Sequence, residues 1–322
     1  MILTVTLNPA LDKFYWLEHL PESLAPSEEG VTIRTTKSLT SAGGKGINVS
    51  VFLAAHDIDT VAMGFLGGHT GQVILRDLLA RGVSTNFVWI DEENRTNVAL
   101  IVRGHEYCPI HIHEEGPPIP AEALRIFLRK YERMLLRASY VVLAGALPPG
   151  IPLDFYQDLA RRAREKGVRV VVHAGGEPML RSLAERPFLV KPDVREGLRF
   201  GDLPLHTEEG VIAAGRRAIA QGAEICLISH QLTGDILVSA EGIWKFEAKT
   251  PLSAFRNLVG ADDALVGGVL VGLHQGADLI ESVKYGMAAA VASAEVEEKL
   301  CLDRKKILAE LEKVEVRRRE GS

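Results

Sequence analysis

Two adjacent aspartates, Asp262 and Asp263, follow Gly260-Ala261 and precede an apolar stretch that predicts a helix, in the segment NLVGADDALVGG at residues 257–268. The free backbone N–H groups at a helix start can gather around an anion, such as the charge that develops during phosphoryl transfer. A carboxylate there can also accept a proton from a substrate hydroxyl. The alternative is a purely structural role for the two aspartates, as an N-cap followed by an acidic residue in the first turn, since both stabilise a helix. On spacing alone, the cap is favoured.

A glycine-rich turn, SAGGKGIN at residues 41–48, opens another predicted helix. Glycines let the backbone come close to a ligand, and the helix start offers N–H donors to oxygen atoms. The turn is neither a Walker A loop, which has GK[ST] after four spacers, nor a GxGxxG dinucleotide motif. Taken alone, it fits a structural turn as well as a ligand-binding one.

His111 and His113 are two residues apart on a predicted strand, so both project to one face of it. Cys108 and Glu114 are close in sequence, and together these residues could form a metal site. A fourth well-spaced ligand is not evident, and histidines on the solvated face of a strand are far commoner than metal ligands.

The elements that must position these residues form two patterns. From about Tyr140 onward, apolar strands alternate with helices, which predicts a parallel sheet covered on both faces. The expected strands are YVVLAG, VRVVVHA, FLVKPD and ICLISH, and the tail DRKKILAELEKVEVRRREGS is expected to be a solvated last helix.

The first third of the chain alternates apolar and polar residues in GVTIRTTKSL, TNFVWI and TNVALIVRGHEYCPIHIH. This alternation predicts strands with one wet face. We expect a small antiparallel sheet, contributed by roughly residues 13–38 and 86–114, that covers an α/β body as a lid. No internal repeat or low-complexity linker divides the chain, so we expect residues 1–322 to form one α/β domain.

Composition excludes several classes of protein. The formal charge of −5 argues against nucleic-acid and anionic-membrane partners, which need a basic surface. The three cysteines, Cys108, Cys226 and Cys301, contain no CxxC pair, so a disulfide framework or a structural zinc site is not expected. No segment has the length and apolarity of a membrane span. We expect a soluble cytoplasmic protein.

The two glycine-rich segments, SAGGKGINVS and NLVGADDALVGG, together resemble the signature regions of the ribokinase-like (PfkB) carbohydrate kinases. The order of TLNPALDK, GALPPG, LVKPDVRE and ISHQLTGD agrees with that family over residues 1–295. The chain looks most similar to the fructose-1-phosphate and tagatose-6-phosphate kinases, whose chains begin with a TLNPALD-like strand. The resemblance implies a ribokinase-like three-layer fold, with a mainly parallel central sheet flanked by helices and a small antiparallel β lid. It also implies phosphorylation of a sugar hydroxyl with ATP and Mg²⁺.

The resemblance assigns expected roles on the sugar side. Arg95 matches an arginine that holds the phosphate already present on the substrate, which suits its planar fork of donors. His111 falls near a second phosphate contact. The positions that match sugar-hydroxyl contacts, with the lysine of the same turn, are Asp12, Gly43, Gly44, Asn48 and Lys45.

On the nucleotide side, KPDVRE matches a KPNxxE segment that influences magnesium and the ATP phosphates, with Glu196 acting on Mg²⁺ through water. Asp263 matches the catalytic base. The backbone of Gly260, Ala261 and Asp262 matches the anion hole. The remaining expected nucleotide-side positions are Lys191, Asp193, Ser229, Gly234 and Val259.

Several positions differ from the family pattern. Asp262 stands where GAGD has a glycine. If its carboxylate faced the γ-phosphate at about 4 Å, the repulsion would be several kcal/mol. If it pointed outward, only backbone strain would result, should a positive φ be required. The other differences are Ala146 for serine, His173 for aspartate, Asp193 for asparagine and Gln231 for glycine.

Two functions follow from the sequence. The first is a kinase that transfers a phosphoryl group from ATP to a ketohexose phosphate, as a homodimer joined through the lid strands, whose edges are free. The second is a catalytically weakened relative that binds sugar phosphate or nucleotide in a regulatory role. A DNA-binding regulator is excluded, because no basic patch surrounds a recognition helix.

Overall fold

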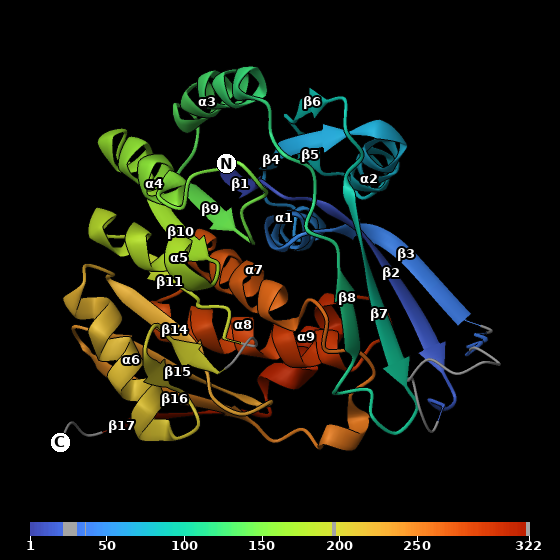
Figure 1. The fold of residues 1–322 in the computed structure, drawn as a ribbon. Helices are drawn as coiled ribbons and strands as arrows, with labels where there is room; N and C mark the ends of the chain where they lie inside the picture. The colour runs from blue at the N-terminus through green and yellow to red at the C-terminus, as the bar shows by residue number, and fades with distance from the viewer. Residues whose placement is uncertain (22–30, 36, 195–197, 320–322) are drawn as a thin grey trace.

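The computed structural model describes residues 1–21, 31–35, 37–194 and 198–319. A central sheet of 11 strands runs through the molecule (Figure 1). In spatial order its strands are β17 (Val314–Arg319), β16 (Gly242–Ala248), β15 (Gly234–Ser239), β14 (Ile225–Ser229), β11 (Leu189–Val190), β10 (Arg169–His173), β9 (Tyr140–Ala144), β1 (Ile2–Thr6), β4 (Thr60–Gly67) and β5 (Ser84–Thr85), and β6 (Val88–Ile90) also pairs with β4.

The middle of this sheet is parallel. Ile2 of β1 lies opposite Thr60 of β4 on one side and Tyr140 of β9 on the other, and both pairings run in the same direction. All five side chains of β1 are buried, because helices cover both faces of the sheet. The pairings of β14 with β15, β15 with β16 and β16 with β17 are antiparallel. The expected mainly parallel sheet is confirmed.

Helices form a layer on each face of the sheet (Figure 1). One layer contains α1 (Lys45–Ala55), α2 (Gly68–Ala80), α7 (Ala261–His274), α8 (Leu279–Ala294) and α9 (Arg304–Leu311). The other contains α3 (Ala121–Leu135), α4 (Phe155–Glu165), α5 (Gly176–Ser182) and α6 (Glu208–Ala220). Short pieces are the 3₁₀ turns η1 (Leu183–Glu185) and η2 (Leu252–Ala254) and the hairpin of β12 (Arg199–Phe200) and β13 (Leu203–Pro204). The three-layer fold is confirmed.

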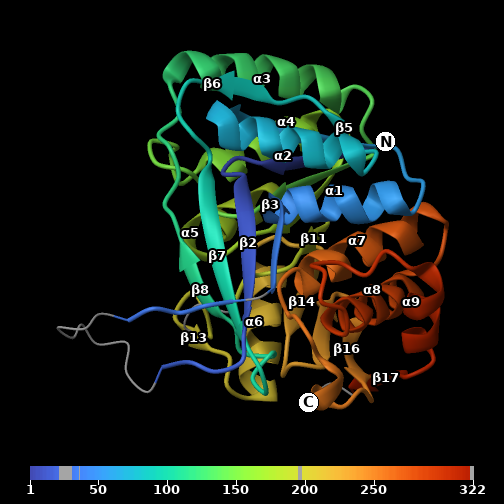
Figure 2. The ribbon, with the colours of Figure 1, turned by 90° about the vertical axis from the view of Figure 1, so that its right-hand side faces the viewer.

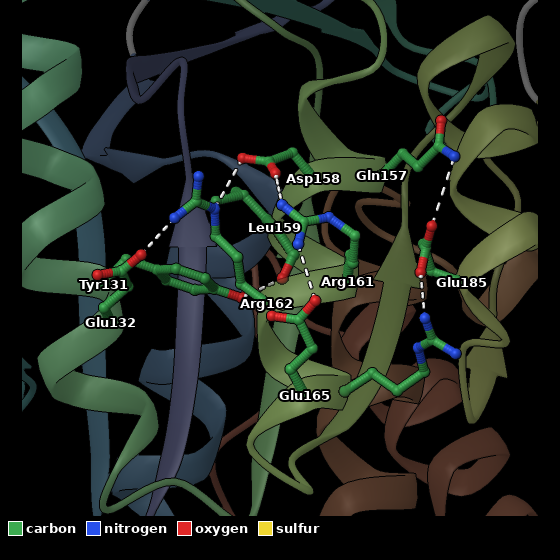
Figure 3. A network of polar contacts seen from close by, with 10 residues as sticks. Tyr131, Glu132, Gln157, Asp158, Leu159, Arg161, Arg162, Glu165 and Glu185 are labelled. Atoms are coloured by element: carbon green, nitrogen blue, oxygen red, sulfur yellow. Dashed lines mark hydrogen bonds and ion pairs between the residues drawn. The ribbon is translucent and has the colours of Figure 1, made fainter.

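A polar network joins α3 to α4 in the second helix layer (Figure 3). The hydroxyl of Tyr131 donates to the carbonyl of Leu159 at 2.9 Å, and Arg162 pairs with both Asp158 and Glu132. The middle of α4 is thereby fixed against α3. At the start of α4, the buried hydroxyl of Tyr156 donates to the carbonyl of Ala144 at 2.9 Å, at the end of β9.

The small sheet has the order β3 (Lys37–Gly43), β2 (Ala10–Leu17), β7 (Arg95–Val102) and β8 (Ile110–His113), and it stands beside α1 and α2 (Figure 2). The expected antiparallel pairing is present between β2 and β3 and between β7 and β8. The central pair, β2 with β7, differs because it is parallel. The chain passes through α1, β4 and α2 between these two strands, and such a long connection permits parallel pairing.

One further strand prediction and one helix prediction were wrong. The segment TNFVWI was expected in the lid, but its strand β6 pairs with β4 of the main sheet. Val88 and Ile90 are buried and Trp89 is exposed. The alternation of apolar and polar residues correctly predicted a strand, but it could not predict which sheet the strand joins. The tail was expected to remain helical, but α9 is followed by β17, whose residue Val314 is buried beside β16.

The two sheets meet where β1 ends. From β1 the sheet continues to β4 on one side and to β9 on the other, so the strand order reverses direction at this point. Open α/β sheets bind ligands at such a switch point, outside the carboxyl ends of the strands. The chain then leaves β1 directly into β2 of the small sheet. Within the described ranges, no helix combines the length and apolarity required to cross a membrane.

Candidate active site

A cleft of about 450 Å³ lies between the small sheet and the carboxyl edge of the main sheet. Its walls come from the end of β1, from β2, β7 and β8, and from the starts of α1 and α7. Ten residues to which the resemblance assigned a role line this cleft: Asp12, Gly44, Lys45, Asn48, Arg95, His111, Asp193, Val259, Gly260 and Asp263. The glycine turn of the early chain and the acid of the last third therefore share one cavity.

The other residues to which the resemblance assigned a role in substrate binding or catalysis lie outside the lining of this cleft. Gly43 sits behind the side chain of Asp12. Ala261 and Asp262 form the first turn of α7. Lys191, Ser229 and Gly234 lie at the ends of β11 and β14 and the start of β15, and Glu196 falls outside the described residues.

Asp263 is held by two hydrogen bonds in the first turn of α7. Its Oδ2 accepts from Nδ2 of Asn48 at 2.6 Å, and its Oδ1 lies 2.9 Å from Nε2 of His173. Burial alone would raise the pKa of this carboxyl, but the hydrogen bond from His173 and the positive charge of Lys45 lower it below its ordinary value. An ionised Asp263 is thus available as a proton acceptor at neutral pH.

Gly260 shapes the start of α7. Its φ of 91° lies in the left-handed region, where a side chain is disfavoured. A Cβ at this position would lie 2.6 Å from the carbonyl oxygen of Lys299. Only glycine fits, and the first N–H groups of the helix that follows are left without partners inside the helix. Because Gly260 and Asp263 line the cleft, this helix start borders the cavity.

The carboxylate of Asp262 is matched by a buried ammonium group. Its Oδ1 lies 3.0 Å from Nζ of Lys191 and 3.3 Å from Oγ of Ser229. Lys191 is fully buried and also lies 3.4 Å from Oδ1 of Asp235. Burial opposes a charged lysine, but the two carboxylates outweigh it and raise the pKa of Lys191. Burial raises the pKa of Asp235 to about 6.

Asp262 takes helical backbone angles, so a positive φ is not required at this position. The strain considered for an outward-pointing Asp262 therefore does not arise. By contrast, Gln231, which replaces a family glycine, has a φ of 67°. A non-glycine residue in this conformation costs roughly 1–2 kcal/mol.

Asp12 is fixed by two residues that the sequence analysis did not single out. Nζ of Lys299 donates to its Oδ2 at 2.8 Å, and Nδ2 of Asn97 donates to its Oδ1 at 3.0 Å. Asn97 is two residues after Arg95 on β7, so the strand period would have placed both on one face. Lys299 comes from the segment after α8, and no local pattern connects it to β2.

Arg95 lies at the base of the small sheet, largely buried. Its Nε donates to the carbonyl of Asn8 and its Nη1 to the carbonyl of Glu114, both at 3.2 Å. Burial lowers its pKa, although the charges of Asp12 and Glu114 oppose this shift. A guanidinium stays charged in proteins, so Arg95 supplies a fixed cation to the cleft.

His111 and His113 are exposed on β8 and both line the cleft, with ring centroids 5.3 Å apart. No group of three or more metal-ligating side chains occurs among residues 1–21, 31–35, 37–194 and 198–319. A metal site at these histidines therefore gains no support.

A family model described as "pfkB family carbohydrate kinase" matches residues 6–301. The chain belongs to the pfkB family of carbohydrate kinases. The resemblance inferred from the two signature segments is thereby confirmed, and the cleft is the candidate active site of a pfkB-family kinase.

Three similar proteins refine this placement within the pfkB family. The chain is 34% identical over 299 residues to a 1-phosphofructokinase of Bacillus subtilis, covering 92% of this chain and 94% of that protein. It is 28% identical over 298 residues to a tagatose-6-phosphate kinase of Staphylococcus epidermidis, covering 90% and 92%. The crystal structure of a Thermotoga maritima protein described as a possible 1-phosphofructokinase matches with a TM-score of 0.89 and 30% identity, over 99% of both chains.

Gly43 gives a first prediction for this site. A Cβ on Gly43 would lie 2.2 Å from Oδ2 of Asp12, so Gly43→Ala must displace that carboxylate. We expect Gly43→Ala to weaken sugar binding about tenfold or more and to destabilise the protein by roughly 1–3 kcal/mol. Calorimetric titration and urea denaturation measure the two effects. Unchanged sugar affinity would show that the position of Asp12 does not matter for binding.

Proposed function

We propose that this kinase transfers the γ-phosphoryl group of ATP to a hydroxyl of a ketohexose phosphate, of the fructose-1-phosphate or tagatose-6-phosphate type. The observation that carries the proposal is the shared cleft, in which the side chains of Asp263, Asp12 and Arg95 line one cavity. A phosphorylated sugar could place its reacting hydroxyl at Asp263 and its other hydroxyls at Asp12. Its phosphate could then pair with the guanidinium of Arg95. The names of the similar proteins support the same substrate class.

In this mechanism, Asp263 accepts the proton of the attacking hydroxyl as the oxygen bonds to phosphorus. The N–H groups at the start of α7 stabilise the charge on the transferring group. Asp12 and Asn48 orient the sugar, and Arg95, with His111, binds the phosphate it already carries. The small sheet covers the sugar, which limits competition from water as an acceptor.

We propose that ATP lies beside the sugar, toward the carboxyl ends of β11 and β14, with contacts from Lys191, Asp193, Ser229 and Gly234. Val259 forms part of the wall between the two substrates. Mg²⁺ would accompany ATP, because this ion is usually held by substrate phosphates, waters and one or two carboxylates rather than by a cage of side chains. When bound, it neutralises charge on the phosphates, and Glu196 is the candidate for contact through water.

We also propose a homodimer formed through the small sheet. Within the described ranges, the outer strands β3 and β8 each pair with a neighbouring strand on one side only, although the backbone N–H of Ala42 on β3 also donates to Asp77. Ile112 on β8 is 56% exposed, and Ile33, shortly before β3, is 39% exposed. Strand edges and exposed apolar side chains favour association with a second copy.

All three cysteines are free, which fits the reducing cytoplasm that we propose as the location.

Asp262 offers the test that separates a working kinase from a weakened one. Its pairing with Lys191 supports a role in which it does not repel the phosphate. The experiment compares ADP release by the wild type and by Asp262→Gly, using ATP, Mg²⁺ and a panel of phosphorylated and plain ketohexoses. The proposal expects robust turnover by the wild type with a phosphorylated sugar. Turnover by the glycine variant alone would favour the weakened regulatory relative.

Arg95 gives a second prediction. Removing its charged hydrogen bonds to the substrate phosphate should cost about 1.5–3 kcal/mol each, so Arg95→Ala should raise KM for the phosphorylated sugar roughly 10- to 100-fold. The KM for ATP should stay nearly constant. Steady-state kinetics measure both values.

Arg103 provides the matched control, because it lies just after β7 but is 76% exposed and pairs only with Glu18 among the ion pairs of the described residues. Arg103→Ala should leave both KM values unchanged. Equal effects of the two substitutions would contradict the phosphate role of Arg95.

A further inference from the structure

A buried histidine contacts the proposed base on the side away from the substrate cleft. His173 ends β10 and is 0% exposed. Its Nε2 lies 2.9 Å from Oδ1 of Asp263, and its Nδ1 lies 3.0 Å from the carbonyl oxygen of Lys191. Asp263 lines the cleft, whereas His173 does not.

The two contacts of the His173 ring require more protons than a neutral imidazole carries. A neutral imidazole has one N–H donor, whereas a backbone carbonyl and an ionised carboxylate can only accept. If the single proton is on Nδ1, the lone pair of Nε2 faces the carboxylate of Asp263. If it is on Nε2, the lone pair of Nδ1 faces the carbonyl of Lys191. Both contacts are hydrogen bonds only when a second proton lies between Nε2 and Oδ1.

The neighbouring charged groups do not displace the proton between Nε2 of His173 and Oδ1 of Asp263. The ammonium group of Lys45 lies toward Asp263 and pairs with Asp193 at 2.9 Å. The ammonium group of Lys191 is directed to Asp262 and Asp235 rather than to the ring. The other oxygen of Asp263 accepts from the neutral amide of Asn48. The carboxylate of Asp263 is therefore the direct counter-charge of the ring.

We propose that His173 is a positively charged imidazolium and the positioning residue of Asp263. This inference rests on the proposed function. The ring holds Oδ1, so that Oδ2, beside Asn48 at the cleft, receives the proton of the substrate hydroxyl. In the reaction, the hydroxyl O–H bond and the bond between the γ-phosphorus and the bridging oxygen of ATP break, and the new sugar O–P bond forms. The substrate proton goes to Oδ2 and then to water, while His173 keeps both ring protons.

The pairing also predicts how activity depends on pH. An opposite charge at this distance lowers a carboxyl pKa by roughly 1–3 units. Because the folded pKa of Asp263 is depressed, the ionised base persists above that value and is lost as the pH falls through it. Without the charged ring of His173, burial would raise the pKa of Asp263, and fewer neighbouring groups would lower it. The acid limb of the kcat profile should then move to higher pH by roughly 1–3 units.

The first experiment measures the ring directly by ¹⁵N NMR of histidine-labelled protein near neutral pH. We expect both nitrogens of His173 to carry protons in the wild type, and we expect Asp263→Asn to remove one of them. A wild-type ring with an unprotonated nitrogen would overturn the proposal. This readout needs no turnover, so it stands even where the proposed function fails.

The second experiment compares pH profiles of kcat for the wild type, His173→Asn and His206→Asn. His206 is exposed on the segment before α6 and serves as the control. The acid limb should rise for His173→Asn alone. An unchanged limb in a folded His173→Asn variant would show that the ring is only structural. If His173→Asn does not fold, the NMR comparison decides.

Discussion

Asp263→Asn should lower kcat by about 10²–10⁴-fold while leaving the dissociation constant of the sugar phosphate nearly unchanged. An amide cannot accept the proton of the attacking hydroxyl, and positioned acid–base groups contribute rate factors of this order. The shape of the side chain is kept. Asn48 can turn its own amide to pair with the new N–H group, so the loss should fall on turnover. Single-turnover kinetics and calorimetric titration measure the two quantities.

The control for this substitution is Glu281→Gln, which removes one exposed carboxylate from the first turn of α8. It should leave kcat within a factor of about two, because surface substitutions away from special features have small effects. An Asp263→Asn variant that kept the wild-type rate would remove Asp263 from its proposed role. Equal loss of sugar affinity and rate would instead indicate a binding residue.

Lys191→Met should destabilise the protein by roughly 3–5 kcal/mol, because it leaves the carboxylates of Asp262 and Asp235 without their buried partner. Urea denaturation at pH 7 measures this loss. Asp235 adds a pH dependence. The pKa of Asp235 in the folded protein, about 6, lies above its ordinary value. Protonated Asp235 therefore adds to the free energy of unfolding below about pH 4, and this contribution is lost as the pH rises through 6.

Two further variants test the cause of that loss. Lys249→Met removes an exposed lysine that pairs with Glu315, and it should cost less than about 1 kcal/mol. Adding Asp262→Gly to Lys191→Met should recover part of the stability, since it removes one of the two carboxylates that lost the ammonium group of Lys191. A Lys191→Met variant as stable as the Lys249→Met control would show that the buried charges do not depend on one another.

The sequence predicted the parts of the site that depend on local pattern. The glycines and the acid in NLVGADDALVGG indicated a helix start with a carboxylate, and α7 begins at Ala261 with Gly260 as its N-cap. The glycine turn indicated a second helix start, and α1 begins at Lys45. The resemblance to a family then predicted that these two distant segments face each other, which spacing alone could not do.

Contacts between distant elements could not be predicted in this way. His173 stood out only as a departure from the family pattern, because nothing in β10 shows that it meets α7. Lys299 was missed because its contact with Asp12 spans 287 positions. The strand β6 was assigned to the wrong sheet for a related reason. Alternation indicates that one face of a strand is buried, but the neighbouring strand is chosen by the whole fold.

³¹P NMR of the wild-type reaction with ATP, Mg²⁺ and either fructose-1-phosphate or tagatose-6-phosphate shows whether the cleft transfers a phosphoryl group from ATP to a sugar phosphate. We predict a new phosphate ester on the sugar, with one ADP formed for each ester, and formation of both products at least about 10²-fold more slowly with Asp263→Asn. Sugar phosphate that binds without forming an ester, in the wild type and in Asp262→Gly alike, would contradict the proposed kinase activity.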